Sequence, residues 1–295
     1  MNKLLYLITL TGLLFTASCG SDDDEPQHSS IYNRSYTLLN HVTDASTGNV
    51  LAVTKGNIKY TLDVINMTAD AEFGVKLDGK TETPFSFKGV KIINPSYGFY
   101  RFDNKTPASS IADFVGIVDL NEEATQFSFT SGGKYRVCAT LPEIFFLNCN
   151  TVTAYSDGSS YDHKDDKPMY QFDINPETMT AKVTIMTFND TKQYKFINNC
   201  SGNGAQVVAT TDGYTITADK IITTTYYTQG TTVTNDIDAV EDDGSEANKD
   251  KPKKQYIIYN LNAKLNIFAN TIQATFKLGS KIDKSFSVTV NGTVY

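Results

Sequence analysis

Apolar and polar residues alternate with a period of two along much of this chain. The clearest stretches are FSFT at 127–130, KVTIMTF at 182–188, TIQATFKL at 271–278 and SFSVTVNG at 285–292. Alternate side chains of a strand point to opposite faces of a sheet, so the pattern predicts strands with one buried face. No long stretch places apolar residues at helical spacing. We therefore expect an all-β protein.

An internal repeat with an offset near 110 residues divides the chain. IKYTLDVINMTADAEF at 58–73 is echoed by PMYQFDINPETMTAKVTI at 168–185. The matched positions are Tyr60 with Tyr170, Asp63 with Asp173 and Ala69 with Ala181. The repeat predicts two antiparallel β domains in tandem, at 33–142 and 143–295, each with seven or eight strands. Sandwich and barrel both remain open, and chance likeness between β stretches is the alternative.

The second predicted domain carries an insertion at 228–254 that is polar, first acidic and then basic. Such a segment has almost no residues for a core, so we expect a flexible loop. Its carboxylates offer hard oxygen ligands that could hold calcium, at Asp236, Asp238, Asp242 and Asp243. Their spacing is not that of a known calcium loop, which favours a solvated acidic loop and no bound metal.

Residues 1–18 have the features of a secretory signal peptide. Lys3 precedes an apolar run, and the small residues Ala17 and Ser18 follow it. The run is too short to span a bilayer.

The signal ends in FTASC, which resembles the lipobox of bacterial lipoproteins and implies cleavage before Cys19 and lipid on its thiol. The acids that follow resemble the surface-export signal of Bacteroidota lipoproteins, at Ser21, Asp22, Asp23, Asp24 and Glu25. Physically, 19–32 is a solvated tether. The resemblance implies a surface lipoprotein without assigned activity, anchored in the outer membrane and facing the cell exterior. A periplasm-facing tether and an ordinary signal peptide with an incidental cysteine are the alternatives.

The net charge of the 295 residues is −7. Nucleic acid and anionic membrane surfaces attract clustered Lys and Arg, so the charge argues against both as partners. The expected membrane contact is therefore through lipid on Cys19 alone.

Three further cysteines occur in the predicted mature chain. They are too scattered for a zinc site. An exported protein can keep disulfides, and we expect Cys149 to pair with Cys200 while Cys138 stays buried and free. Three buried free thiols are an equal alternative.

Signatures of catalysis are missing from the sequence. It has three histidines and contains no G-x-S-x-G, H-E-x-x-H or phosphate-loop motif. We expect no cofactor and no enzyme activity. The repeated Asp63 and Asp173 are expected to cap turns.

Clustered aromatic residues are the candidate ligand contacts, because exposed rings stack on sugars and bind proteins. They are Tyr97, Tyr100 and Arg101 in one cluster and Tyr226 and Tyr227 in another. Alternating aromatic residues in strands also form cores.

These features favour a non-enzymatic surface module that binds a glycan or a protein. A fimbrial-type subunit or anchor is the alternative, in which Arg34 could be a protease site that frees a groove for donor-strand exchange. A hydrolase whose carboxylate pair is assembled only by the fold is a further alternative.

Overall fold

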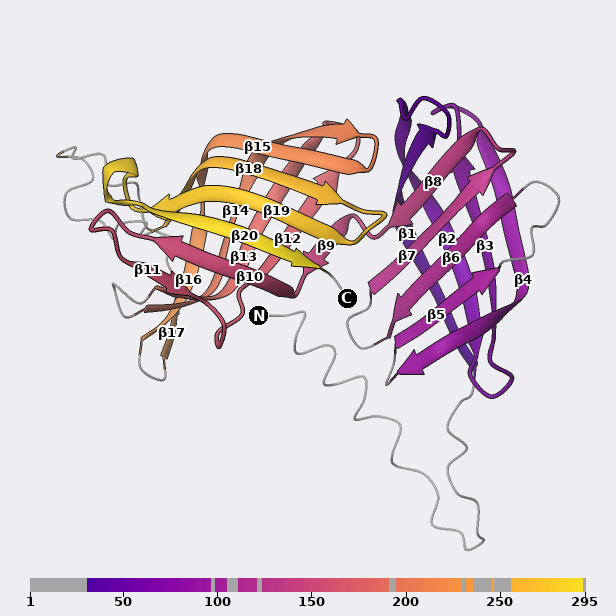
Figure 1. The fold of residues 1–295 in the computed structure, drawn as a ribbon, viewed down its shortest axis with the longest axis horizontal. Helices are drawn as coiled ribbons and strands as arrows, with labels where there is room; N and C mark the ends of the chain where they lie inside the picture. Colours follow the sequence, from indigo (N-terminus) through magenta and orange to yellow (C-terminus); the bar gives the residue numbers. More distant parts are fainter. Residues whose placement is uncertain are drawn as a thin grey trace, which may run out of the picture.

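A computed structural model describes residues 31–96, 99–104, 111–120, 124–190, 195–229, 232–235, 246 and 256–293. Their regular structure is almost entirely β-strand, which confirms the all-β prediction (Figure 1). Cys19 and the acidic run after it lie outside the described residues. The lipid anchor and the export signal therefore stay predictions.

The first eight strands form a closed antiparallel barrel. Closure comes from β1, which pairs with β2 on one side and with β8 on the other. The strands are β1 (Ile31–Asp44), β2 (Val50–Asp63), β3 (Thr68–Lys76), β4 (Glu82–Ser96), β5 (Phe99–Asn104), β6 (Ile111–Asp119), β7 (Ala124–Ser131) and β8 (Tyr135–Thr140). The first strand thus begins two residues before the expected domain start.

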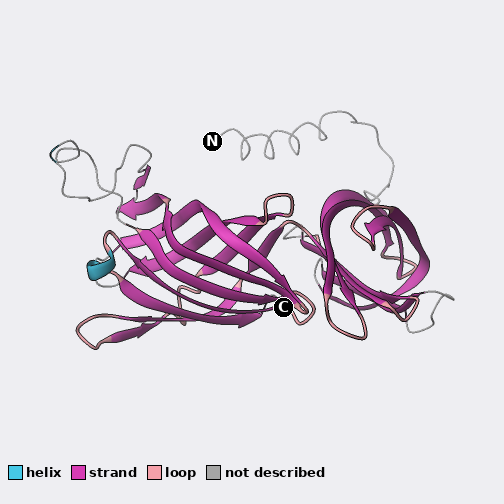
Figure 2. Cartoon of the chain, turned by 90° about the horizontal axis from the view of Figure 1, so that it is seen from above, coloured by secondary structure: helices cyan, strands magenta, loops and turns pink. Residues whose placement is uncertain are grey.

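The rest of the chain forms a 12-stranded sheet that curls on itself but stays open (Figure 2). Ten strands follow the order β11-β10-β20-β19-β18-β15-β14-β13-β12-β9, and β16 and β17 extend from β14. The strands are β9 (Glu143–Phe146), β10 (Asn148–Ala154), β11 (Ser160–Asp162), β12 (Met169–Asn175), β13 (Thr180–Asp190), β14 (Lys195–Thr210), β15 (Gly213–Ile222), β16 (Thr224–Gln229), β17 (Thr232–Asn235), β18 (Ile257–Asn266), β19 (Thr271–Gly279) and β20 (Phe286–Thr293). A 3-10 turn, η2 (Ile282–Lys284), precedes β20.

The second half departs from the repeat and from the expected loop in two places. It is not a copy of the barrel, because β9 pairs with β12 while β10 pairs with β20, so that its path ends at β9 and β11. The expected flexible loop also begins as a hairpin, in which Tyr226 of β16 lies opposite Asn235 of β17. The acidic residues from Asp236 to Asp243 lie outside the described residues.

Phenylalanine side chains fill the barrel. The rings of Phe87 and Phe114 stack with centroids 3.5 Å apart. The ring of Phe73 has four other rings, that of Phe87 among them, with centroids within 6.0 Å. Inward residues of β2 and β3 alternate with exposed ones, as the period-two pattern requires. An eight-stranded barrel is just wide enough for side chains to fill, so this interior is a core.

A shared turn links β2 to β3 in the barrel and β12 to β13 in the sheet. Met67 and Met179 occupy the last loop position of their hairpins and adopt positive φ angles of 54° and 50°. Each is followed by threonine at the start of the next strand. The repeat found in the sequence is therefore a repeated hairpin rather than a repeated domain.

The expected aspartate caps hold for one copy only. Asp63 Oδ1 accepts hydrogen bonds from the backbone N–H groups of Ile65 and Asn66. In the second copy Asn175 takes that place, and Asp173 lies within β12 opposite Lys182. The prediction for Asp173 is wrong because the strands of the repeat match at one offset and the loops match at an offset two residues larger. The residue that corresponds to Asp63 in the loop is therefore Asn175.

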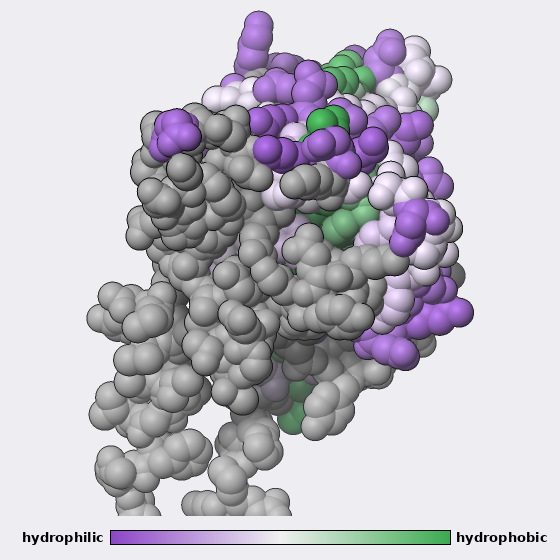
Figure 3. Space-filling model, turned by 90° about the vertical axis from the view of Figure 1, so that its left-hand side faces the viewer, coloured by the Kyte–Doolittle hydropathy of each residue, from purple (hydrophilic) through white to green (hydrophobic). Residues whose placement is uncertain are grey.

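The described surface at the end of the sheet away from the barrel is mainly hydrophilic, with small hydrophobic patches (Figure 3). Among the described residues no helix is long and apolar enough to cross a membrane.

Candidate functional site

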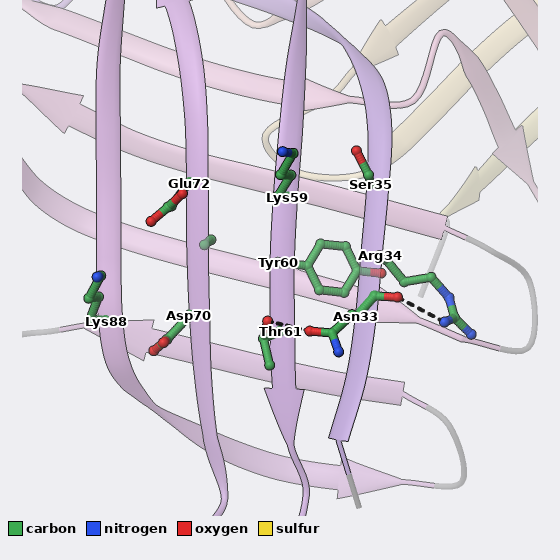
Figure 4. A pocket seen from close by; sticks show the side chains of 10 residues that line it. Asn33, Arg34, Ser35, Lys59, Tyr60, Thr61, Asp70, Glu72 and Lys88 are labelled. Carbon is green, nitrogen blue, oxygen red and sulfur yellow. Dashed lines mark hydrogen bonds between the residues drawn. The ribbon is translucent and has the colours of Figure 1, made fainter. Parts of the chain in front are cut away.

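A hollow of about 480 Å³ lies on the wall of the barrel formed by β1 to β4 (Figure 4). Polar and charged residues from all four strands line it. They are Asn33, Arg34, Ser35, Lys59, Tyr60, Thr61, Asp70, Glu72 and Lys88, and Ala71 completes the lining. Its volume falls within the range of about 300–1,000 Å³ that is usual for ligand sites.

Strand register brings these side chains together. Lys59 of β2 lies opposite Ser35 of β1 on one side and Glu72 of β3 on the other. One step along, Thr61 lies opposite Asn33 and Asp70 in the same way. Cross-strand neighbours on one face have Cβ atoms about 4.5–5.5 Å apart, so four strands place a dense polar patch on one surface.

Charges alternate in sign across β4, β3 and β2, while Arg34 adds a further cation on β1. Lys88 on β4 is followed by Asp70 and Glu72 on β3 and then by Lys59 on β2 (Figure 4). Within the described part of the chain, the side chains of Lys59, Glu72 and Lys88 make no hydrogen bond or ion pair. These three charged groups are therefore available to a ligand.

The polar groups around the charges are held in place. Thr61 Oγ1 donates to Asn33 Oδ1 at 2.6 Å, and the Gly89 N–H donates to Asp70 Oδ1 at 2.7 Å. Tyr60 is buried against the barrel core, and burial raises the pKa of its phenol, which stays protonated. The hollow thus combines hydrogen-bonded polar groups with charged side chains that have no partner among the described residues.

Neither carboxylate of the hollow resembles a catalytic acid. Asp70 and Glu72 are both exposed to solvent, whereas the hydrolase alternative requires a buried pair. No group of three or more His, Cys, Asp or Glu residues that could hold a metal occurs among the described residues. The arrangement can recognise a ligand by charge and hydrogen bonds.

The aromatic candidates are not brought together by the fold. Tyr100 and Arg101 lie on β5 of the barrel, whereas Tyr226 and Tyr227 lie on β16 of the sheet. Tyr100 packs against the barrel core, and burial raises the pKa of its phenol, while Arg101 is exposed. Tyr97 lies outside the described residues, as does the side chain of Tyr227.

Residues of the hollow were missed in the sequence because none of them forms a motif. Their only signal is polar alternation at Asn33/Ser35, Lys59/Thr61 and Asp70/Glu72. That signal marks an outward face, but strand pairing alone shows that the faces adjoin.

All three described cysteines are free and buried. The expected Cys149–Cys200 disulfide is not formed in this structure. Cys149 lies on β10 and Cys200 on β14, with four other strands between them in the sheet order. Each thiol instead has its own acceptor, the carbonyl of Phe146 for Cys149 and the hydroxyl of Thr223 for Cys200.

A buried histidine pairs with an aspartate near the open seam of the sheet. His163 Nδ1 lies 2.8 Å from Asp166 Oδ2, which also accepts the N–H of Asn189. The pair joins the segment after β11 to the end of β13 and so has a structural role.

The sheet has a smaller hollow of about 320 Å³ on the outer face of β18, β19 and β20. Amides and hydroxyls dominate its lining, and Lys264 is the one charged residue in it. It provides a matched surface for comparison with the barrel wall.

Arg34 lies inside β1 opposite Tyr60 and is exposed. Downstream of it, residues 39–44 of β1 pair with β8 and the strand also pairs with β2. A cut after Arg34 would therefore leave residues 39–44 of β1 paired with β8, and the strand after the cut still paired with β2.

Comparisons with known proteins give likeness of structure alone. No protein-family profile matches the sequence, and no curated protein matches it. A candidate outer membrane protein from Bacteroides fragilis NCTC 9343 is similar in structure, with 12% identity, a TM-score of 0.34, and coverage of 88% of this chain and 96% of that one. Isotype 1 transferrin-binding protein B from serogroup B Neisseria meningitidis is similar with 8% identity, a TM-score of 0.24, and coverage of 90% and 77%. Likenesses at these TM-scores carry no argument about function.

Proposed function

We propose that this chain is a non-enzymatic, lipid-anchored surface module that binds a protein partner through the hollow on its barrel wall. The observation that carries the proposal is the set of charged side chains from three adjacent strands that surround one hollow and have no partner among the described residues. Charged groups left free at a surface cost little until a complementary partner covers them.

The alternation of charge favours a protein over a simple anion or cation. A single phosphate or sulfate would be attracted by Lys59 and Lys88 but repelled by Asp70 and Glu72 between them. A protein surface can present an alternating pattern of its own and so match both signs. Such complementarity mainly sets specificity and the rate of association.

The proposed location of this binding, outside the cell, depends on the predicted lipid anchor and export signal at the N-terminus. Lipid on Cys19 and the acidic tether would hold the barrel outside the cell, where a surface partner is accessible. Two lipid chains or more are needed for stable anchoring.

The test is an array of purified matrix proteins and glycans probed with the chain from residue 28 onward. We expect binding to a protein that weakens with salt and falls at least tenfold in the double variant Lys59→Glu/Lys88→Glu. Lys264→Glu, in the hollow of the sheet, is the matched control and should bind as the wild type does. Binding to glycans alone, or to a protein with equal affinity in both variants, would contradict the proposal.

A further inference from the structure

Strands β1 and β8 form the side of the barrel next to the curled sheet (Figure 1). Buried side chains on their outer face make a contact between the two parts. Leu39 and Cys138 belong to the barrel by sequence but pack in the apolar core of the sheet. The Cys138 thiol and the Gln126 amide both donate to the carbonyl of Ile267, in the turn between β18 and β19. The two parts are thus docked through side chains that face away from the barrel interior.

His41 sits in the middle of this contact. It lies opposite Cys138 of β8 and Val53 of β2, so that its side chain also faces outward. Its ring makes an edge contact with Tyr214 of β15 at 5.1 Å and with Phe268 at 6.4 Å. The side chain is fully buried, and neither ring nitrogen has a hydrogen-bond partner among the described residues.

The charged and titratable groups around His41 come from both parts. From β8, Arg136 places its guanidinium 3.5 Å from the Phe268 ring and pairs with Asp212 at 2.9 Å. Cys138 and Tyr214 are buried, and burial raises the pKa of each, so both stay neutral in acid. Among the described residues, Asp212 is the anion whose charge acts on His41, and it is paired with Arg136. Glu177 of the sheet also lies at this contact, where it pairs with Lys55 of β2.

We propose that His41 is an acid-sensitive latch, whose protonation releases the curled sheet from the barrel. A buried imidazolium needs a hydrogen-bond acceptor or an anion. In the docked state the nearby acceptors are the backbone groups of Thr210 and Thr211, neither of which forms a hydrogen bond of good geometry with the ring, and the Arg136 cation lies nearby. In the undocked state the ring meets water and accepts a proton freely. Acid therefore favours undocking.

The direction of the pH effect on docking, and the pH range in which it occurs, follow from the difference in the pKa of His41 between the docked and undocked states. Burial, together with the charge of Arg136, lowers the pKa of His41 from 6.5 to about 4, against an opposing effect of the Thr210 and Thr211 backbone. The docked state therefore binds fewer protons between pH 6.5 and pH 4, and docking weakens as pH falls through that range. The docking equilibrium would drop by up to about tenfold per pH unit, roughly 300-fold in all.

Spin labels at Lys91→Cys on the barrel and Asn262→Cys on the sheet would report docking in the chain from residue 28 onward. Distances measured by double electron–electron resonance should be narrow at pH 7.5 and broaden with a midpoint between pH 6.5 and pH 4. His41→Phe keeps an aromatic ring but cannot titrate, so its distances should stay narrow at pH 4.5. His163→Gln, at the other buried histidine, is the control and should open as the wild type does.

Wild-type distances that stay narrow to pH 4.5, or His41→Phe opening at the wild-type midpoint, would overturn the latch. If His41→Phe is misfolded, NMR titration of the His41 ring in the wild type decides instead, because its apparent pKa must coincide with the opening midpoint. The hollow on β1 to β4 plays no part in this test. Partner binding and domain docking can therefore fail independently.

Discussion

At the scale of single residues, burial decides the chemistry of the cysteines. Cys138 and Cys149 lie in apolar surroundings that raise the pKa of each thiol to about 12, and burial raises that of Cys200 as well. Only the thiolate attacks a disulfide reagent. The spacing of the cysteines in the sequence could not reveal this, because it contains no information on depth.

The chain from residue 28 onward should therefore be almost inert to a chromogenic disulfide reagent at pH 8. After unfolding in denaturant without a reductant, three thiols should react per chain, because their pKa values return to the ordinary range. Counting the released chromophore in both states is the measurement. A single thiol after unfolding would show that two of the three cysteines are joined, and peptide mapping would then identify the pair.

At the scale of elements, the turn residues decide how the hairpins close. Asp63 accepts two backbone N–H groups in its loop, and these hydrogen bonds lower the pKa of its carboxyl group. Asp173 looked equivalent in the sequence but has no such loop, since its copy of the turn is closed by Asn175. Identical residues at matching positions of the repeat, Asp63 and Asp173, therefore have different structural roles.

Asp63→Ala should lower the melting temperature, because the backbone N–H groups of the turn lose their acceptor and the turn conformation is then less favoured. Asp63→Asn keeps the acceptor oxygen and should restore most of the loss. Asp173→Ala is the matched control and should melt within a degree or two of the wild type. Thermal unfolding followed by circular dichroism compares all three, and equal losses at both positions would refute the assignment of the cap.

The hydrogen bonds of Asp63 also predict how the stability of the fold changes with pH. The pKa of Asp63 is lower when folded than its ordinary value of 3.8. Its contribution to stability is therefore present at neutral pH and lost as pH falls through the folded pKa. The stability difference between wild type and Asp63→Asn should accordingly narrow below pH 4 in denaturant titrations. A stability difference between wild type and Asp63→Asn that grows below pH 4 would contradict this prediction.

At the scale of the whole molecule, the barrel and the sheet are held together by surfaces that neither would need alone. Leu39 faces outward from β1 yet is fully buried by the sheet. Lys55 and Glu177 form an ion pair across the same contact, at 3.4 Å between exposed side chains. Exposed pairs contribute little, so the apolar residues provide most of the docking energy.

Leu39→Glu should separate the two parts and leave both folded, because the new carboxylate is stable in water but not in the apolar contact. Small-angle X-ray scattering should show a larger radius of gyration at neutral pH, while the far-ultraviolet circular dichroism spectrum stays that of the wild type. Lys55→Ala is the control and should leave the radius unchanged. Loss of the β spectrum in Leu39→Glu would show that docking is required for folding.

The sequence determined the class of the protein and the position of many strands. Period-two alternation specified the buried faces, because consecutive residues of one strand, such as Phe127 to Thr130, alternate between the buried and the outer face. The repeated turn could be found for the same reason, because its glycine-free loop and following threonine are contiguous in the chain. Local patterns of this kind need no knowledge of distant residues.

Tertiary structure alone decided closure, the hollow and the latch. Whether β1 pairs with β8, or β10 with β20, depends on register between segments far apart in the chain. The hollow exists only because pairing places Asn33, Lys59 and Glu72 side by side. His41 likewise gains its unusual environment from Tyr214 and Phe268, more than 170 residues away, through a contact that no local pattern encodes.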